Sequence, residues 1–134
     1  MRAVLDVNVL ISGLLAPAGA SALLIRRWLA GDFELVVSER LLAELGRALA
    51  YPKLRARVPD AAAAEFTGLL RATATIRPDP PNAPRQSRDP GDDYLIALAE
   101  SSASLLVTGD KDILDSSGSR PILTPASFVA RLGA

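Results

Sequence analysis

The sequence contains no cysteine and no histidine among its 134 residues. Without cysteine the chain has no disulfide framework, no thiolate nucleophile and no thiolate zinc site. Without histidine it lacks the commonest general base of proteins, the catalytic triads that depend on that base, and imidazole metal ligands. Any hydrolytic chemistry must therefore use carboxylates, lysine, tyrosine, or a metal ion that oxygen atoms bind.

Aromatic residues are scarce, and neither sign of charge predominates. Three Phe, two Tyr and one Trp leave few platforms on which nucleic-acid bases can stack. Acidic and basic residues balance at 15 each, so the overall charge neither favours nor excludes a polyanionic partner. The basic residues are mainly arginine, which suits bidentate phosphate contacts and is equally expected from GC-rich codons.

Long hydrophobic runs are also missing. No stretch approaches the roughly 20 apolar residues of a membrane span. The apolar run at the N-terminus, MRAVLDVNVL, is too short for a signal peptide because Asp6 interrupts it. We therefore expect a cytoplasmic protein without a membrane partner. The 134 residues are enough for one domain, 1–134, whose single core needs no disulfides.

Short apolar runs alternate along the chain with segments of helical periodicity. The apolar runs predict strands at 2–7, 33–38, 73–76, 102–110 and 120–124. The periodic segments predict helices at about 19–30, 39–50, 60–72, 92–101 and 125–132. Strands that alternate with helices indicate an α/β fold, a mainly parallel sheet with helices on both faces.

Four acidic residues, distant in the sequence, are expected at one edge of this sheet. Asp6 follows the first strand, Asp110 follows the strand around Val107, and Asp92 begins a helix. The carboxyl ends of parallel strands and the N-termini of the following helices share one edge, where ligands bind. Glu44 borders the buried leucine stripe of its helix, and its long side chain leans back toward the same edge.

Further aspartates accompany these four. Helical angles place Asp92 on the buried stripe of its helix and Asp93 off it, so Asp92 is the better ligand. Asp93 is then a supporting residue or a substitute, and Asp89 is expected to cap the helix. Asp112, in GDKD, is an additional candidate ligand. Its alternative role, shared with the aspartate two residues before it, is in a turn.

Carboxylates gathered at one edge repel each other unless a cation lies between them. Oxygen ligands without His or Cys suit Mg²⁺ or Mn²⁺, which also bind phosphates. Such an ion makes a nucleophile from bound water and stabilises the oxygens of a phosphoryl displacement. Each residue also has an ordinary explanation, such as helix capping for Asp6 and surface exposure for Glu44. Their shared edge is what favours a metal site.

Four motifs carry a family resemblance. LDVNVLISGLL, SERLLAEL, DPGDDYLIALA and LLVTGDKDIL, in this order and spacing, resemble the PIN-domain ribonucleases. The closest likeness is to the toxin components of prokaryotic toxin–antitoxin pairs. The resemblance covers nearly the whole chain and implies a single PIN-like nuclease domain with a three-layer α/β/α fold.

The resemblance also implies roles for individual residues. The implied acidic metal site for Mg²⁺ or Mn²⁺ consists of Asp6, Glu44, Asp92 and Asp110. The implied supporting polar residues are Asn8, Ser12, Ser38 and Thr108. The implied reaction is metal-dependent hydrolysis of single-stranded RNA, often by a homodimer, with a small antitoxin protein in the active-site groove.

Basic residues in two segments are candidates for contacts with RNA phosphates. They are Lys53, Arg55, Arg57, Arg85 and Arg88. Their alternative is ordinary solvated charge on surface loops. The scarcity of aromatic residues leaves the base specificity unpredicted.

Two other functions fit parts of the pattern. A receiver-like phosphoacceptor also gathers aspartates, Mg²⁺, a Thr and a Lys at a sheet edge. It needs an acceptor Asp at the end of a central strand, and neither FELVVS nor TATI is followed directly by one. A non-catalytic scaffold that binds RNA or an antitoxin-like partner would bind without metal-dependent turnover. The complete acidic set favours the nuclease.

Overall fold

Five short parallel strands form the centre of the structure, a computed structural model that describes residues 1–81, 93–115 and 121–133. The strands are β1 (Arg2–Leu5), β2 (Glu34–Val37), β3 (Thr75–Ile76), β4 (Leu105–Val107) and β5 (Ile122–Leu123). Their order in the sheet is β3-β2-β1-β4-β5, and every neighbouring pair is parallel. The central strands are apolar on both faces because both faces are covered. This confirms the predicted α/β class.

The direction in which strands are added reverses between β1 and β4. From β1 the chain adds β2 and β3 on one side, and it then returns to add β4 and β5 on the other. Leu5 pairs with Val107 at the carboxyl ends of these two central strands. Ligands of open parallel sheets bind outside the strand ends at such a reversal. The topology therefore points to the ends of β1 and β4 as the position of a ligand site.

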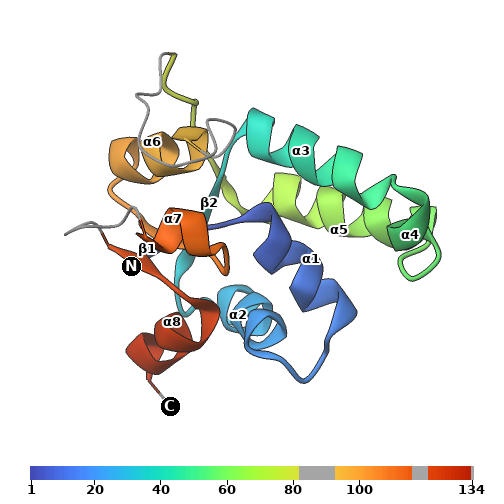
Figure 1. The fold of residues 1–134 in the computed structure, drawn as a ribbon, viewed down its shortest axis with the longest axis horizontal. Helices are drawn as coiled ribbons and strands as arrows, with labels where there is room; N and C mark the ends of the chain where they lie inside the picture. Colours follow the sequence, from blue (N-terminus) through green and yellow to red (C-terminus); the bar gives the residue numbers. More distant parts are fainter. Residues whose placement is uncertain (82–92, 116–120, 134) are drawn as a thin grey trace.

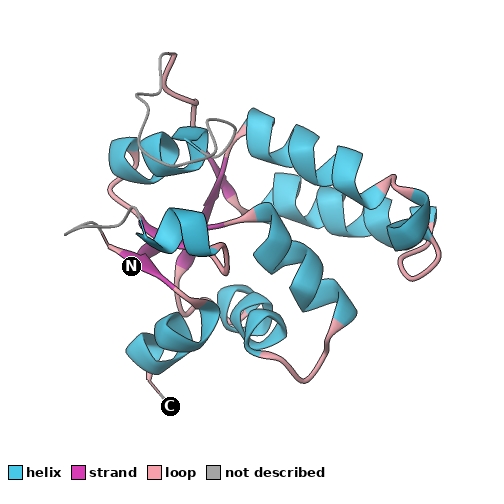
Figure 2. Cartoon of the chain, viewed as in Figure 1, coloured by secondary structure: helices cyan, strands magenta, loops and turns pink. Residues whose placement is uncertain are grey.

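Eight helices of the described residues surround the strands (Figure 1; Figure 2 shows the strands enclosed by them). They are α1 (Val7–Leu15), α2 (Ala20–Leu29), α3 (Glu39–Leu49), α4 (Pro52–Arg55), α5 (Asp60–Thr73), α6 (Asp93–Ser101), α7 (Lys111–Asp115) and α8 (Pro125–Leu132). In Figure 1, α6 lies on one side of the strands, and α1, α3 and α5 lie on the other. Helices thus cover both faces, as expected for three layers.

The core joins the sheet to both helical layers. Helix α1 packs on α2 and α3, and α6 packs on β1 and β4. Phe33, which precedes β2, meets Phe128 of α8 edge-to-face with ring centroids 5.0 Å apart. Such a pair contributes about 0.5–1.5 kcal/mol beyond the apolar area that it buries. Trp28 is also buried in this core, in agreement with its position on the apolar face of α2.

Helices α1 and α7 differ from the sequence prediction. A helix beginning near residue 7 was only the alternative for the segment after the first strand, and α7 was not predicted. Val7, Val9 and Ile11 are β-branched, which lowers the intrinsic helix propensity of α1. All three are buried, so tertiary packing outweighs local preference. Strands β1 and β4 therefore end earlier than predicted, because these two helices begin soon after them.

Gly13 lies at a close crossing of α1 and α2. A Cβ atom at this position would lie 2.3 Å from Cδ1 of Ile25 and 3.2 Å from the backbone oxygen of Ser21.

Taken singly, none of the helices in the described ranges is long and apolar enough to cross a membrane. Helices α1 and α2 taken together are long and apolar enough to cross a membrane, but the chain bends by 98° between them.

Candidate active site at the carboxyl edge of the sheet

Asp6 ends the first strand and also precedes the first helix. Its backbone N–H donates to the carbonyl of Val107 at 2.9 Å, which continues the pairing of β1 with β4. Its side chain makes no capping hydrogen bond to α1. Instead, Oδ2 of Asp6 accepts a hydrogen bond of 2.7 Å from the hydroxyl of Thr108. Helix capping therefore does not account for the carboxylate, which is held across the strand reversal.

Thr108 connects the aspartates that follow the two central strands. It is fully buried directly after β4. Its hydroxyl donates to Asp6 and accepts the backbone N–H of Asp110 at 3.0 Å. A hydroxyl has one proton and two lone pairs, so both contacts are satisfied at once. A hydrogen bond to a carboxylate is among the stronger kinds, and it holds Asp6 in a defined orientation.

Asp110 has a structural role at the start of α7. Its Oδ1 accepts the backbone N–H of Asp112 at 2.8 Å, and its carbonyl accepts that of Leu114 at 3.0 Å. The turn role expected as the alternative is therefore present, and Asp110 also accepts hydrogen bonds from the first residues of α7. The same contacts hold the carboxylate of Asp110 near Asp6, where the two charges act on each other. One residue can thus cap a helix and still face the site.

The pKa of Asp6 depends on its burial, its hydrogen bonds and the neighbouring acidic residues. Burial, which leaves 5% of the residue exposed, raises the pKa of Asp6 above its ordinary value. The hydrogen bond from Thr108 and the backbone N–H of Asn8 partly offset this rise, whereas the charges of Asp110 and Glu44 add to it. Carboxylates from two distant parts of the chain therefore repel the charge of Asp6. A cation among them would relieve this repulsion.

Glu44 meets a residue that the sequence analysis did not single out. The hydroxyl of Tyr94, on α6, donates a hydrogen bond to Oε2 of half-buried Glu44, on α3. Burial, followed by the hydrogen bond to Glu44, raises the pKa of Tyr94 above its ordinary value. The phenol therefore remains a proton donor to the carboxylate. The position of Tyr94 next to the aspartate doublet in DPGDDYLIALA could have marked it as a site residue. In the sequence, however, Tyr94 has the same pattern as an ordinary core residue of a helix.

Arg40 brings a positive charge to the same place. Its guanidinium carbon lies 4.3 Å from the centroid of the Tyr94 ring. The charge of Arg40 counteracts the rise in the pKa of Tyr94 that the neighbouring carboxylates cause. Residues four apart on a helix share a face, so Arg40 and Glu44 project from adjacent turns of α3. The sequence analysis also missed Arg40 as a site residue.

The other predicted supporting residues have different surroundings. Ser38 is fully buried and caps α3, since its Oγ accepts the backbone N–H of Leu41 at 3.2 Å. Asn8 and Ser12 are exposed on successive turns of α1. Thr108 hydrogen-bonds a candidate ligand directly. Thr108, at the end of β4, therefore supports the candidate ligand Asp6 directly. Ser38 instead stabilises the start of α3, the helix that carries Glu44.

The aspartate doublet is only partly described. Asp92 lies outside the described residues, as does Asp89, so their predicted roles as ligand and cap stay predictions. Asp93 begins the described part of α6 and is 4% exposed. The prediction that Asp93 lies off the buried stripe is therefore wrong. The angular argument assumed one covered face, but every residue from Asp93 to Ala99 is buried.

The basic candidates lie mainly at the surface. Arg85 and Arg88 fall outside the described residues. Lys53 is exposed on α4, and Arg55 forms an ion pair with Asp60 at 2.6 Å. Arg57 donates to the backbone oxygen of Leu15 at 3.4 Å. The contacts of Arg55 and Arg57 resemble the surface alternative more than a prepared phosphate site.

The chemistry of the acidic residues fits a hard divalent cation. Asp6, Glu44 and Asp110 offer oxygen ligands only, and the charges of Glu44 and Asp110 act on Asp6. Within residues 1–81, 93–115 and 121–133, however, no three acidic side chains are close enough to hold a metal ion. These three residues thus match Mg²⁺ or Mn²⁺ in ligand type without forming a complete ligand set by themselves.

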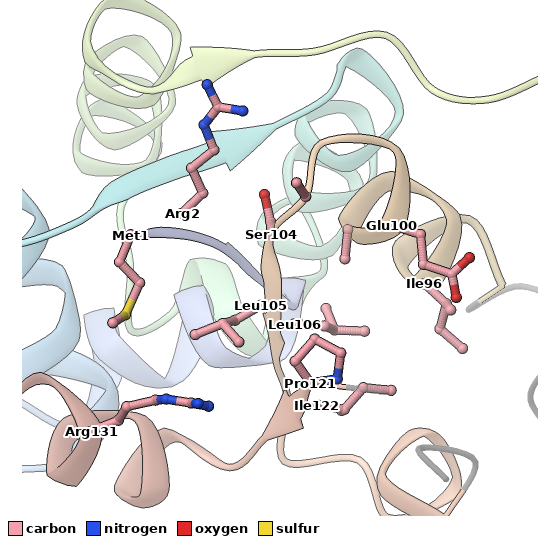
Figure 3. A pocket seen from close by; sticks show the side chains of 12 residues that line it. Met1, Arg2, Ile96, Glu100, Ser104, Leu105, Leu106, Pro121, Ile122 and Arg131 are labelled. Carbon is pink, nitrogen blue, oxygen red and sulfur yellow. The ribbon is translucent and has the colours of Figure 1, made fainter. Parts of the chain in front are cut away.

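A cavity of about 540 Å³ lies at the opposite edge of the sheet, where β1, β4 and β5 begin (Figure 3). Most of its lining is apolar, with Ile96, Leu105 and Ile122 among the contributing side chains. Arg2 and Arg131 are its basic lining residues. None of the acidic candidates contributes to it, so this cavity is separate from the site at the carboxyl edge.

Comparison with known proteins agrees with this architecture. The crystal structure of PAE2754 from Pyrobaculum aerophilum superimposes with a TM-score of 0.67 at 23% identity, over 98% of this chain and 89% of that one. A PilT N-terminus domain protein, SSO1118 from Sulfolobus solfataricus P2, gives 0.54 at 12% identity, over 99% and 94%. These identities establish the fold alone.

The sequence itself was compared with curated proteins and with family profiles. No curated protein matches it significantly. The profile described as PIN domain matches residues 2–112, a range that begins with β1 and includes Asp6, Glu44 and Asp110. Since this match covers most of the chain, the protein belongs to the PIN domain family.

Proposed function

We propose that the protein is a Mg²⁺- or Mn²⁺-dependent endoribonuclease that hydrolyses single-stranded RNA. PIN domains are generally nucleases, and they typically use divalent metal ions. The observation that carries the proposal is the buried Asp6, which Thr108 holds at the strand reversal while Glu44 and Asp110 act on its charge. Without histidine or cysteine in the chain, an oxygen-ligated metal ion is the natural source of hydrolytic chemistry.

Asp6, Glu44 and Asp110 would hold the metal ion, with Asp92 as the fourth proposed ligand and Asp93 as support. A divalent ion in such a site supplies a nucleophile derived from water and stabilises charge on the phosphate. The chain's own contribution is to orient the ligands before the ion arrives. Ligands that other residues already orient need less reorganisation when the charge of the substrate changes.

Each of the three described ligands has an orienting partner. Thr108 holds Asp6, and the backbone N–H of Asp112 holds Oδ1 of Asp110. The hydroxyl of Tyr94 holds Glu44. We also propose Asp112, whose backbone N–H makes this contact, as an additional ligand.

Cleavage of a labelled single-stranded RNA with Mg²⁺ or Mn²⁺ tests this proposal. We expect Asp6→Asn to lower the rate by about 100-fold or more, the scale on which one preorganised electrostatic group acts. Asp32→Asn is the matched control, because Asp32 is a surface residue paired with Arg27 before β2. Equal rates for the native protein and Asp6→Asn would contradict the assignment. Binding of RNA without metal-dependent turnover would indicate a scaffold instead.

We also propose a biological setting, in which the protein is the cytoplasmic toxin of a toxin–antitoxin pair and acts as a homodimer. The support is the likeness of its motifs to those of the toxin components. Expression of the chain alone should then arrest bacterial growth, whereas Asp6→Asn should not. Normal growth with both proteins would contradict the toxin role. The nuclease proposal would still be decided by the RNA cleavage assay.

A further inference from the structure

Tyr94 contacts two side chains of α3, one through its hydroxyl and the other through the face of its ring. Its hydroxyl donates to the carboxylate of Glu44, and its face lies against the guanidinium of Arg40, with 4.3 Å from Cζ to the ring centroid. Tyr94 is 2% exposed, so its ring is fixed by the core. One rigid aromatic side chain therefore contacts an anion and a cation that occupy adjacent turns of the same helix.

Arg40 and Glu44 carry opposite charges on the same face of α3 but form no salt bridge with each other in the described residues. Opposite charges four residues apart on a helix are well placed for a salt bridge. No such bridge forms in the described structure, although Arg2, Arg27, Arg55 and Arg71 each pair with a carboxylate. The Tyr94 hydroxyl occupies Oε2 of Glu44, and the Tyr94 ring occupies the face of the Arg40 guanidinium. Tyr94 thus contacts both charged groups, which form no salt bridge with each other among the described residues.

The guanidinium of Arg40 makes no hydrogen bond with the part of the chain that the structure describes. Among the described residues no side chain or carbonyl accepts a hydrogen bond from it, and only its backbone N–H is engaged, with Asp79 at 3.4 Å. Arg40 is exposed, so its donors are accessible from solvent. Stacking on an aromatic face fixes the plane of a guanidinium and leaves the N–H groups at its edge free. A fixed fork of donors that has no acceptor among residues 1–81, 93–115 and 121–133 matches the oxygens of a phosphate.

We propose that Arg40 binds a phosphate of the RNA strand beside the metal site, and that Tyr94 positions both Arg40 and the metal ligand Glu44. This inference rests on the proposed nuclease function and assigns it a substrate contact outside the basic segments predicted from the sequence. Arg40 meets the strand within one helical turn of Glu44. Tyr94 acts only through these two residues and takes no part in the reaction itself.

RNA affinity tests the role of Arg40. A fluorescent single-stranded RNA is titrated with the full chain carrying Asp6→Asn, which prevents cleavage, in the presence of Mg²⁺. Arg40→Ala in this background should raise the Kd about tenfold, the scale of hydrogen bonds to charged groups. Arg40→Lys should recover only part of the loss, because an ammonium lacks the planar fork. Arg131→Ala, an exposed arginine of α8, is the control and should leave the Kd unchanged.

Metal affinity tests the role of Tyr94 separately. Tyr94→Phe keeps the ring that supports Arg40 but removes the hydroxyl that holds Glu44. We expect the Kd for Mn²⁺, measured by calorimetry, to rise about tenfold, as for other residues that orient metal ligands. In a chain that already carries Glu44→Gln, the same Tyr94→Phe change should have little further effect. Tyr51→Phe, at an exposed tyrosine, is the matched control.

Specific outcomes would overturn the inference. Native RNA affinity in Arg40→Ala would remove the phosphate contact. A loss of Mn²⁺ affinity in Tyr94→Phe that persists fully with Gln at position 44 would mean that Tyr94 acts through the core and not through Glu44. If the native protein neither binds Mn²⁺ nor cleaves RNA, the proposed function itself fails. If it does both while Arg40→Ala has a native KM, only the present inference fails.

Discussion

The hydroxyl of Thr108 donates a 2.7 Å hydrogen bond to the carboxylate of Asp6 and so joins the ends of β4 and β1. These strands flank the point where the order of the sheet reverses, and both residues are buried. A fixed carboxylate at this point is where an open parallel sheet is expected to bind a ligand. The bond therefore serves the stability of the fold and the geometry of the candidate site together.

Thr108→Val should separate these two contributions. Valine keeps the shape of threonine but leaves the Asp6 oxygen without its donor. An unsatisfied buried polar group costs about 1–3 kcal/mol, which urea unfolding in EDTA would measure. RNA cleavage should fall about 10- to 100-fold, as for other residues that orient metal ligands. Thr108→Ser, which keeps the hydroxyl, should retain most of both properties, and a Val variant equal to the native protein would contradict the prediction.

Asp6→Asn should make the metal-free protein more stable at neutral pH. The pKa of Asp6 is raised in the fold, so the folded state binds this proton more tightly than the unfolded chain does. The resulting stability is present below the ordinary pKa of 3.8 and is lost as the pH rises through the raised value. Asparagine does not titrate, so its advantage should appear above this window and fade below it. Urea unfolding in EDTA at a series of pH values checks this, and an Asn variant that is less stable at pH 7 would contradict it.

Mn²⁺ should reverse that order of stability. A ligand present at 100 times its Kd stabilises the folded state by about 2.7 kcal/mol. The native protein should gain this stability in thermal unfolding with Mn²⁺, whereas Asp6→Asn and Glu44→Gln should gain much less. Ca²⁺-free buffer with EDTA provides the reference. An equal gain in all three proteins would place the bound metal away from these carboxylates.

Gly13→Ala and Gly46→Ala should have opposite effects on stability. A methyl group on Gly13 would meet Ile25 at 2.3 Å and crowd the Ser21 carbonyl, whereas Gly46 has nothing within 4 Å of its Cβ position. Alanine inside an exposed helix usually gains about 0.5–1 kcal/mol over glycine, and overpacking costs about 1–3 kcal/mol. Urea unfolding should therefore show a stabilised Gly46→Ala and a destabilised Gly13→Ala. A stabilised Gly13→Ala would show that α1 and α2 separate readily.

Local patterns in the sequence were sufficient for most of the fold. Helices α3 and α8 begin at the predicted residues 39 and 125, where the side chains of Ser38 and Thr124 cap them. Local patterns were insufficient for α1, whose β-branched residues favour a helix only after they are buried. They also misplaced Asp93, because the angular argument assumed that α6 has only one buried side.

The sequence by itself determined the α/β class and the carboxyl edge as the place for Asp6 and Asp110, since strand ends and helix starts are local features. Only the tertiary structure decided that Thr108 serves Asp6 and that Tyr94 stands between Glu44 and Arg40. The first contact spans 102 positions of the chain and the hydrogen bond of Tyr94 to Glu44 spans 50. A hydroxyl shows no preference for one distant carboxylate in the sequence, and it acquires a partner only when packing has brought two elements together.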